Sequence, residues 1–117
     1  NRGTNYHLEA SQESAEELTG AGLPDRLMVD CSHANSREDV RRQSAVLRAV
    51  ASQVDQKSDH VMGVMIESHL VEGNQKLSAD KSALTYGQSV TDACISLETT
   101  AELLAELAAS VARARFN

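Results

Sequence analysis

Residues 27–31 read LMVDC and residues 61–66 read VMGVMI. Each is a short apolar run bounded by turn residues, which is typical of a strand buried on both faces of a sheet. Residues 37–55 connect the two runs and gather their apolar side chains on one face, which predicts a helix. Two buried strands joined by a helical crossover pair in parallel, in a right-handed strand–helix–strand unit. The sequence therefore predicts an α/β fold.

Helices are also predicted before and after this unit in the sequence. Residues 8–21 space their apolar and small residues by three and four with glutamates between them, and Pro24 bars any continuation. Residues 99–115 carry a leucine-rich stripe, and Thr99 with Glu102 matches a helix cap. The expected order is helix, strand, helix, strand, long connection and helix.

Two details of the connections follow from the same patterns. Ser36 followed by Asp39 resembles a capping box, which predicts that the central helix begins at residue 37. No clear period survives over residues 68–91, so we predict a long connection without regular structure. Connections of this length are uncommon in compact domains and are often functional.

The predicted elements do not make a complete domain. Two strands cannot form a stable sheet alone, and both of their edges would stand open. The chain also begins at Asn1 rather than at a methionine. We therefore expect residues 1–117 to be a segment of a larger α/β protein.

The composition excludes several classes of function. The 117 residues include 11 Lys and Arg against 17 Asp and Glu, for a net charge of −6, which argues against binding to nucleic-acid phosphates. Aromatic residues are only 3%, so stacking platforms for bases are not expected. No run approaches the roughly 20 apolar residues of a membrane span. Two cysteines are too few for a disulfide scaffold, so we expect a cytoplasmic protein. From the charge and the lack of a long apolar run, we expect it to bind neither nucleic acid nor membrane.

Polar side chains follow both predicted strands. His33 comes just after the first strand and Glu67 just after the second, 34 residues later. Parallel strands end at the same edge of a sheet, about 4.8 Å apart, and functional residues of α/β proteins gather there. An imidazole and a carboxylate at that edge suit either acid–base chemistry or a divalent metal ion of the Mn, Fe, Co or Zn kind.

Three longer sequence motifs bear on the choice between acid–base chemistry and a metal ion. They read VDCSHANS at residues 29–36, GVMIESHLVEGNQ at residues 63–75 and YGQSVTDAC at residues 86–94. In this order they resemble the class I 3-deoxy-D-arabino-heptulosonate 7-phosphate (DAHP) synthases, also called phospho-2-dehydro-3-deoxyheptonate aldolases. The likeness runs from about Gly3 to the C-terminus.

This resemblance implies a (β/α)8 TIM barrel, which takes about 250 residues. Residues 1–117 would then be its C-terminal segment, comprising helix 6, strand 7, helix 7, strand 8 and helix 8. The implied reaction condenses phosphoenolpyruvate with erythrose 4-phosphate to DAHP and phosphate, the first step of the shikimate pathway to aromatic amino acids. We also expect a homo-oligomer. The alternative is a non-catalytic fragment of that enzyme that folds by self-association.

The resemblance also implies roles for particular residues. His33, Glu67 and Asp92 match three metal ligands of the family, and Asp92 also lies beside the erythrose phosphate. The fourth ligand is a cysteine on an early strand, at a position that neither Cys31 nor Cys94 occupies. The family's phosphate-binding lysines and arginines belong to earlier elements as well, in keeping with the acidic balance of this segment.

The implied mechanism uses the metal as a Lewis acid on the aldehyde oxygen of erythrose 4-phosphate. C3 of phosphoenolpyruvate attacks, water adds at C2, and phosphate leaves by C–O cleavage. Metal binding requires neutral His33, so it should weaken as the pH falls. Either Asp30 or Asn35 could orient the imidazole. For His69 the sequence offers two alternatives, a role beside the site and ordinary packing.

Overall fold

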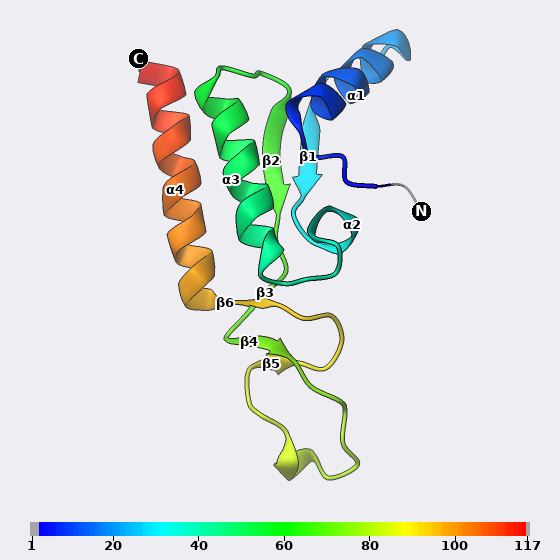
Figure 1. The fold of residues 1–117 in the computed structure, drawn as a ribbon, viewed down its shortest axis with the longest axis vertical. Coiled ribbons are helices and arrows are strands. Elements are labelled where there is room, and N and C mark those ends of the chain that lie inside the picture. Colours follow the sequence, from blue (N-terminus) through cyan, green and yellow to red (C-terminus); the bar gives the residue numbers. More distant parts are fainter. Residues whose placement is uncertain (1–2, 117) are drawn as a thin grey trace.

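The computed structural model describes residues 3–116 as the series of helices and short strands in Figure 1. The elements are α1 (Leu8–Gly20), β1 (Leu27–Asp30), α2 (His33–Ser36), α3 (Arg42–Asp55), β2 (Val61–Met65), β3 (Ser68–His69), β4 (Val71–Asn74), the 3-10 turn η1 (Lys81–Ala83), β5 (Gln88–Ser89), β6 (Ile95–Ser96) and α4 (Leu97–Phe116). The predicted α/β order of the long elements is confirmed. No helix in this part of the chain combines the length and the apolar character that crossing a membrane would require.

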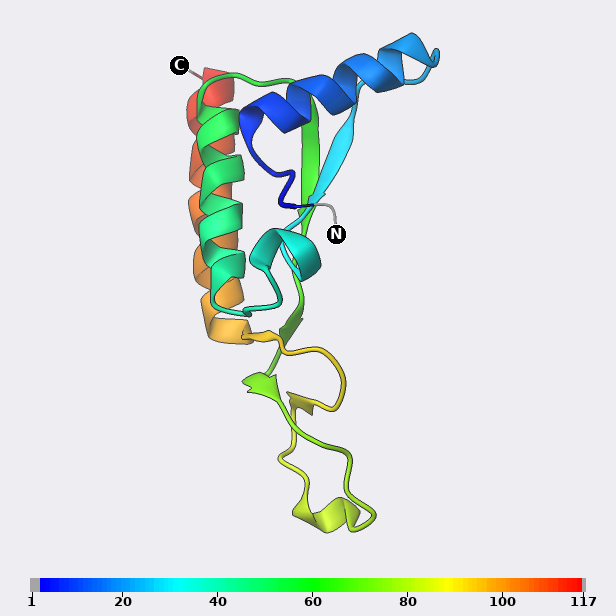
Figure 2. The same ribbon diagram turned by 45° about the vertical axis from the view of Figure 1, so that its right-hand side comes forward.

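β1 and β2 form the predicted parallel pair. Val29 lies opposite Val64 and Asp30 opposite Met65, so the two strands end at the same edge. The helices α3 and α4 lie side by side and cover one face of this pair (Figures 1 and 2). The core between them consists of seven buried residues: Val29, Cys31, Val46, Leu47, Val50, Ile95 and Leu103.

The other face of the pair differs from the sequence-based expectation of strands buried on both sides. Met28 is 62% exposed and Met62 is 65% exposed, because no element among residues 3–116 covers them. The sheet also consists of β1 and β2 alone within this range, so its outer edges are unpaired. Both features leave apolar surface and backbone groups free for further packing.

The predicted start of the central helix at residue 37 was wrong. A four-residue helix, α2, occupies residues 33–36, and α3 begins only at Arg42. Arg37 and Glu38 between them have left-handed φ angles of 53° and 60°. The Ser36 hydroxyl donates to the carbonyl of His33 instead of capping the next helix. The chain therefore turns sharply between the end of α2 and the start of α3.

The predicted cap of the last helix was also wrong, by three residues. α4 begins at Leu97, and the hydroxyl of Ser96 accepts a hydrogen bond from the backbone N–H of Thr99 at 3.1 Å. Ser96 is thus the N-cap, the position at which a serine hydroxyl satisfies a free N–H of the first turn. Farther along, Arg48 on α3 forms an ion pair with Glu106 on α4 at 2.8 Å.

Residues 68–96 form an excursion that extends away from the helices (Figure 1). Residues 68–91, for which we predicted no regular structure, contain the short strands β3, β4 and β5; β4 pairs with β5, and β3 pairs with β6, which follows this stretch. The side chain of Gln75 ties the two arms together, because it donates to the carbonyls of Thr85 and Gln88 and accepts from the Thr85 N–H at 2.9 Å. The excursion is ordered by polar contacts, which leave no periodic apolar pattern in the sequence.

Replacing Gly87 with alanine is expected to destabilise this excursion. Gly87 has a φ of +79°, and a Cβ there would lie 2.8 Å from Cβ of Leu70. Strain of this kind costs about 1–3 kcal/mol, which urea denaturation would measure as a lower free energy of unfolding. Gly20→Ala is the matched control, because nothing lies within 4 Å of the place that its Cβ would take and α1 tolerates alanine. Equal stability of the Gly87→Ala variant and the parent would contradict this expectation.

Candidate metal centre

Three segments deliver the three side chains singled out from the sequence. His33 follows the end of β1 at the start of α2, Glu67 follows the end of β2, and Asp92 precedes β6. Because β1 and β2 are parallel, His33 and Glu67 reach the same edge of the sheet. The excursion brings Asp92 back to this edge through β6, whose residue Ile95 donates its N–H to the Glu67 carbonyl at 3.0 Å.

The structure places these three side chains around one point. Nε2 of His33 lies 3.5 Å from Oε1 of Glu67 and 3.6 Å from Oδ2 of Asp92. One nitrogen or oxygen atom from each residue lies within 4.8 Å of the other two. These separations are too long for strong hydrogen bonds. They are close to the roughly 3.0–3.5 Å expected between donors that each lie about 2.1 Å from a shared ion.

Of the two residues that the sequence suggested for orienting the imidazole of His33, Asp30 and Asn35, it is Asp30 that contacts the ring. Oδ2 of Asp30 lies 2.8 Å from Nδ1 of His33, so Nε2 faces Glu67 and Asp92. The other oxygen of Asp30 accepts hydrogen bonds from the N–H and the hydroxyl of Ser32 at 2.8 and 2.6 Å. The Ser32 hydroxyl also lies 2.9 Å from Nδ1 of His33.

Asn35, the other alternative, supports the turn instead. Its side-chain amide donates to the backbone carbonyl of Asp30 at 2.8 Å, and its Oδ1 accepts from the N–H of Asn5. His69 is also separate from the three clustered side chains, since its Nδ1 accepts from the neighbouring Leu70 N–H at 2.8 Å.

The charges at this edge favour a cation. The hydrogen bond to Asp30 raises the pKa of His33, and the charges of Asp30, Glu67 and Asp92 raise it further. Burial raises the pKa of Glu67, and the nearby charges of Asp92 and Asp30 add to this despite the opposing effect of His33. Crowded carboxylates with one imidazole are relieved by a divalent cation. The donor set of one nitrogen and carboxylate oxygens suits Mn, Fe, Co or Zn, so the residues present fit such an ion.

The pKa of Asp30 shifts in the opposite direction to that of Glu67. Burial alone would raise the pKa of Asp30, but hydrogen bonds from Ser32 and His33 outweigh it and hold this pKa below its usual value. Asp30 is therefore kept ionised as the acceptor for Nδ1 of His33. That arrangement is typical of a carboxylate that orients a metal-binding histidine.

Neither thiol belongs to the cluster. Cys31 is fully buried in the core, and burial raises its pKa to about 12. Cys94 is only partly buried, and burial again raises its pKa. Both cysteines are thus protonated thiols near neutral pH rather than reactive thiolates.

A cavity of about 270 Å³ opens at the cluster. His33, Glu67 and Asp92 line it, together with Gln43 and Asn74. Its wall consists mainly of polar side chains contributed by both strand ends and by the excursion. This cavity is the natural place for a small polar ligand to approach the three side chains.

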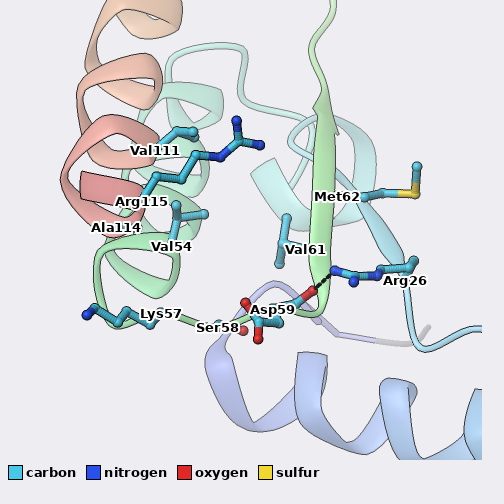
Figure 3. A pocket seen from close by; sticks show the side chains of 10 residues that line it. All are labelled: Arg26, Val54, Lys57, Ser58, Asp59, Val61, Met62, Val111, Ala114 and Arg115. Atoms are coloured by element: carbon cyan, nitrogen blue, oxygen red, sulfur yellow. Dashed lines mark hydrogen bonds between the residues drawn. The ribbon is translucent and has the colours of Figure 1, made fainter. Parts of the chain in front are cut away.

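A larger cavity of about 500 Å³ lies at the opposite end of the β1–β2 pair, near the amino end of β2. Figure 3 shows Val61 and Arg115 projecting into the space between β2 and the helices, with Met62 on the other side of the strand. Arg26 donates a hydrogen bond to the backbone carbonyl of Asp59. The side chains here combine apolar groups with three cations, of Arg26, Lys57 and Arg115, and one carboxylate, Asp59. Among the described residues they form no cluster of potential metal ligands, so the smaller cavity is the better candidate site.

Comparisons with known proteins agree on one family. The model of the DAHP synthetase I family matches residues 1–105. A phospho-2-dehydro-3-deoxyheptonate aldolase of Alternaria alternata is 47% identical over 115 residues, which are 97% of this chain and 31% of that protein. The Tyr-sensitive phospho-2-dehydro-3-deoxyheptonate aldolase of Escherichia coli strain K12 is 47% identical over 103 residues, which are 88% of this chain and 29% of that protein.

A solved structure agrees with the sequence matches. Phospho-2-dehydro-3-deoxyheptonate aldolase from Francisella tularensis is similar with a TM-score of 0.89 and 42% identity, over 97% of this chain and 32% of that chain. The chain thus spans about a third of the length of the curated relatives it matches. With the family match extending over most of its residues, the chain belongs to the DAHP synthetase I family.

Proposed function

We propose that this chain is part of a DAHP synthase, which condenses phosphoenolpyruvate with erythrose 4-phosphate to DAHP and phosphate as the first step of aromatic amino acid biosynthesis. The observation that carries the proposal is the cluster of His33, Glu67 and Asp92 at the shared edge of β1 and β2. The names of its relatives support the same activity.

Residues 1–117 are, in this proposal, the C-terminal segment of a single TIM-barrel domain. α1 corresponds to helix 6, β1 and α3 to strand 7 and helix 7, and β2 and α4 to strand 8 and helix 8. Parallel pairing of β1 with β2 supports this assignment. The exposed face that carries Met28 and Met62 supports it too, because the remaining strands of a barrel would cover that face.

His33, Glu67 and Asp92 are proposed to hold one divalent ion of Mn, Fe, Co or Zn. When bound, such an ion supplies Lewis-acid activation of the aldehyde oxygen of erythrose 4-phosphate. Asp30 orients the imidazole through Nδ1 and so keeps Nε2 directed at the cluster. The side chain of Asp92 is 66% exposed, against 24% for Glu67, so Asp92 is the acidic side chain that a substrate reaches most easily. We propose that it also contacts erythrose 4-phosphate.

The proposed reaction can be tested directly in the full-length protein. We expect phosphate release and DAHP formation when phosphoenolpyruvate, erythrose 4-phosphate and Mn²⁺ are all present. Omission of erythrose 4-phosphate controls for simple hydrolysis of phosphoenolpyruvate. Absence of product with each of Mn²⁺, Fe²⁺, Co²⁺ and Zn²⁺ would exclude the proposed activity.

The isolated 117-residue chain is expected not to turn over these substrates. It carries a net charge of −6, whereas a site for two phosphorylated substrates needs a cationic pocket. Its exposed Met28 and Met62 and the unpaired edges of β1 and β2 favour self-association instead. Size-exclusion chromatography and the same assay check both statements. Product formation by this chain, free of contaminating enzyme, would contradict the expectation.

A further inference from the structure

Gln43, near the start of α3, is a buried polar side chain that also lines the cavity at the cluster. It is 1% exposed, and it is among the largest fully buried side chains of the described residues. Its carboxamide pairs with the backbone of a single residue, Glu67. Oε1 of Gln43 accepts from the Glu67 N–H at 2.9 Å, and Nε2 donates to the Glu67 carbonyl at 3.2 Å.

This pairing holds Glu67 where the chain leaves the sheet. β2 ends at Met65 and β3 begins at Ser68, so the peptide groups of Glu67 lie between two strands. The Glu67 carbonyl accepts a second hydrogen bond, from the N–H of Ile95 at 3.0 Å. Ile95 is three residues beyond Asp92. The backbone of Glu67 is therefore tied to α3 on one side and to the segment that carries Asp92 on the other.

We propose that Gln43 is a positioning residue that holds Glu67 in place for metal binding, an inference that rests on the proposed function. The carboxamide matches both hydrogen-bonding groups of the Glu67 backbone, as a neighbouring strand would. An apolar side chain of similar length would leave the partly buried N–H of Glu67 without its acceptor, and polar groups that lose their partner away from water are costly. Glu67 would then shift, and its carboxylate would no longer lie beside Nε2 of His33.

The test compares two buried glutamines of the same helix in the full-length protein. Gln53 is 4% exposed and donates to the Tyr6 carbonyl, away from the cluster. We expect Gln43→Met to weaken Mn²⁺ binding about tenfold, the lower end of the range for residues that support metal ligands. Gln53→Met should reduce thermal stability and leave Mn²⁺ affinity unchanged. Titration calorimetry measures the affinity, and the absorption spectrum of bound Co²⁺ should change only in Gln43→Met.

A second variant keeps the test decisive if Gln43→Met does not fold. Gln43→Asn retains the carboxamide but is one methylene shorter, so it should weaken Mn²⁺ binding in the same direction. Parent-like affinity and Co²⁺ spectrum in the folded Gln43 variant would overturn the positioning role while leaving the metal centre intact. Equal weakening by Gln53→Met would overturn it as well, because the effect would then be general destabilisation. A parent protein that binds no Mn²⁺ would overturn both this inference and the proposed function.

Discussion

Replacing His33 with alanine is expected to reduce DAHP formation by at least about a thousandfold, because Lewis-acid stabilisation worth several kcal/mol would be lost with the metal. His33 provides the one nitrogen donor of the cluster, and its Nε2 faces both carboxylates. Without it, Glu67 and Asp92 are left as two neighbouring acids with no imidazole between them. Metal content after dialysis and steady-state rates with saturating Mn²⁺ are the measurements.

The matched control is His60→Ala. His60 also pairs through Nδ1 with an aspartate, Asp25, at 3.1 Å, but at the amino end of β2. This variant removes a histidine of the same kind far from the cluster, so metal content and rate should stay at the parent's values. If His33→Ala retained its metal and its rate, His33 would not be a ligand.

The long elements could be predicted because apolar periodicity specifies them. The run at residues 61–66 and the stripe on α3 each have a simple pattern that burial requires. The start of α3 could not be predicted in this way. The turn before it depends on left-handed conformations at Arg37 and Glu38, and neither residue type signals such a conformation.

The candidate site, like the fold, could be predicted only in part from patterns in the sequence. The proximity of His33 and Glu67 follows from parallel strands ending at one edge, so the residues alone indicated it. Asp92 was suggested only by the family resemblance, because its place depends on polar contacts in the excursion, such as Asn74 donating to the Thr91 carbonyl at 2.9 Å. Periodicity carries no information about contacts of that kind.

Gln43 was missed although a signal for it exists. It lies three residues after Val40 and four before Leu47, on the stripe that α3 turns toward the core. A polar residue within an apolar stripe is costly unless both of its hydrogen-bonding groups are satisfied. Such a residue marks a place where a side chain supports the backbone of another segment, here Glu67.

Replacing Asp30 with asparagine is expected to weaken Mn²⁺ binding by about 10- to 100-fold, the range typical for loss of a group that orients a metal-binding histidine. Both oxygens of Asp30 act as acceptors, one for Ser32 and one for Nδ1 of His33. Asparagine has only one oxygen. If that oxygen stays with Ser32, the amide N–H₂ faces Nδ1, and the imidazole then carries its proton on Nε2. Nε2 is the atom directed at Glu67 and Asp92, so this tautomer opposes metal binding.

Asp25→Asn separates this effect from the general loss of an aspartate. Asp25 and Asp30 are similarly exposed, at 44% and 41%, and each pairs with Nδ1 of a histidine. Only the Asp30 pair directs its histidine at other potential ligands, so only Asp30→Asn should lower Mn²⁺ affinity and change the Co²⁺ absorption spectrum. Equal affinities of the two variants would mean that the orientation of His33 does not limit metal binding. Weaker binding without a spectral change would instead assign the effect to the lost negative charge.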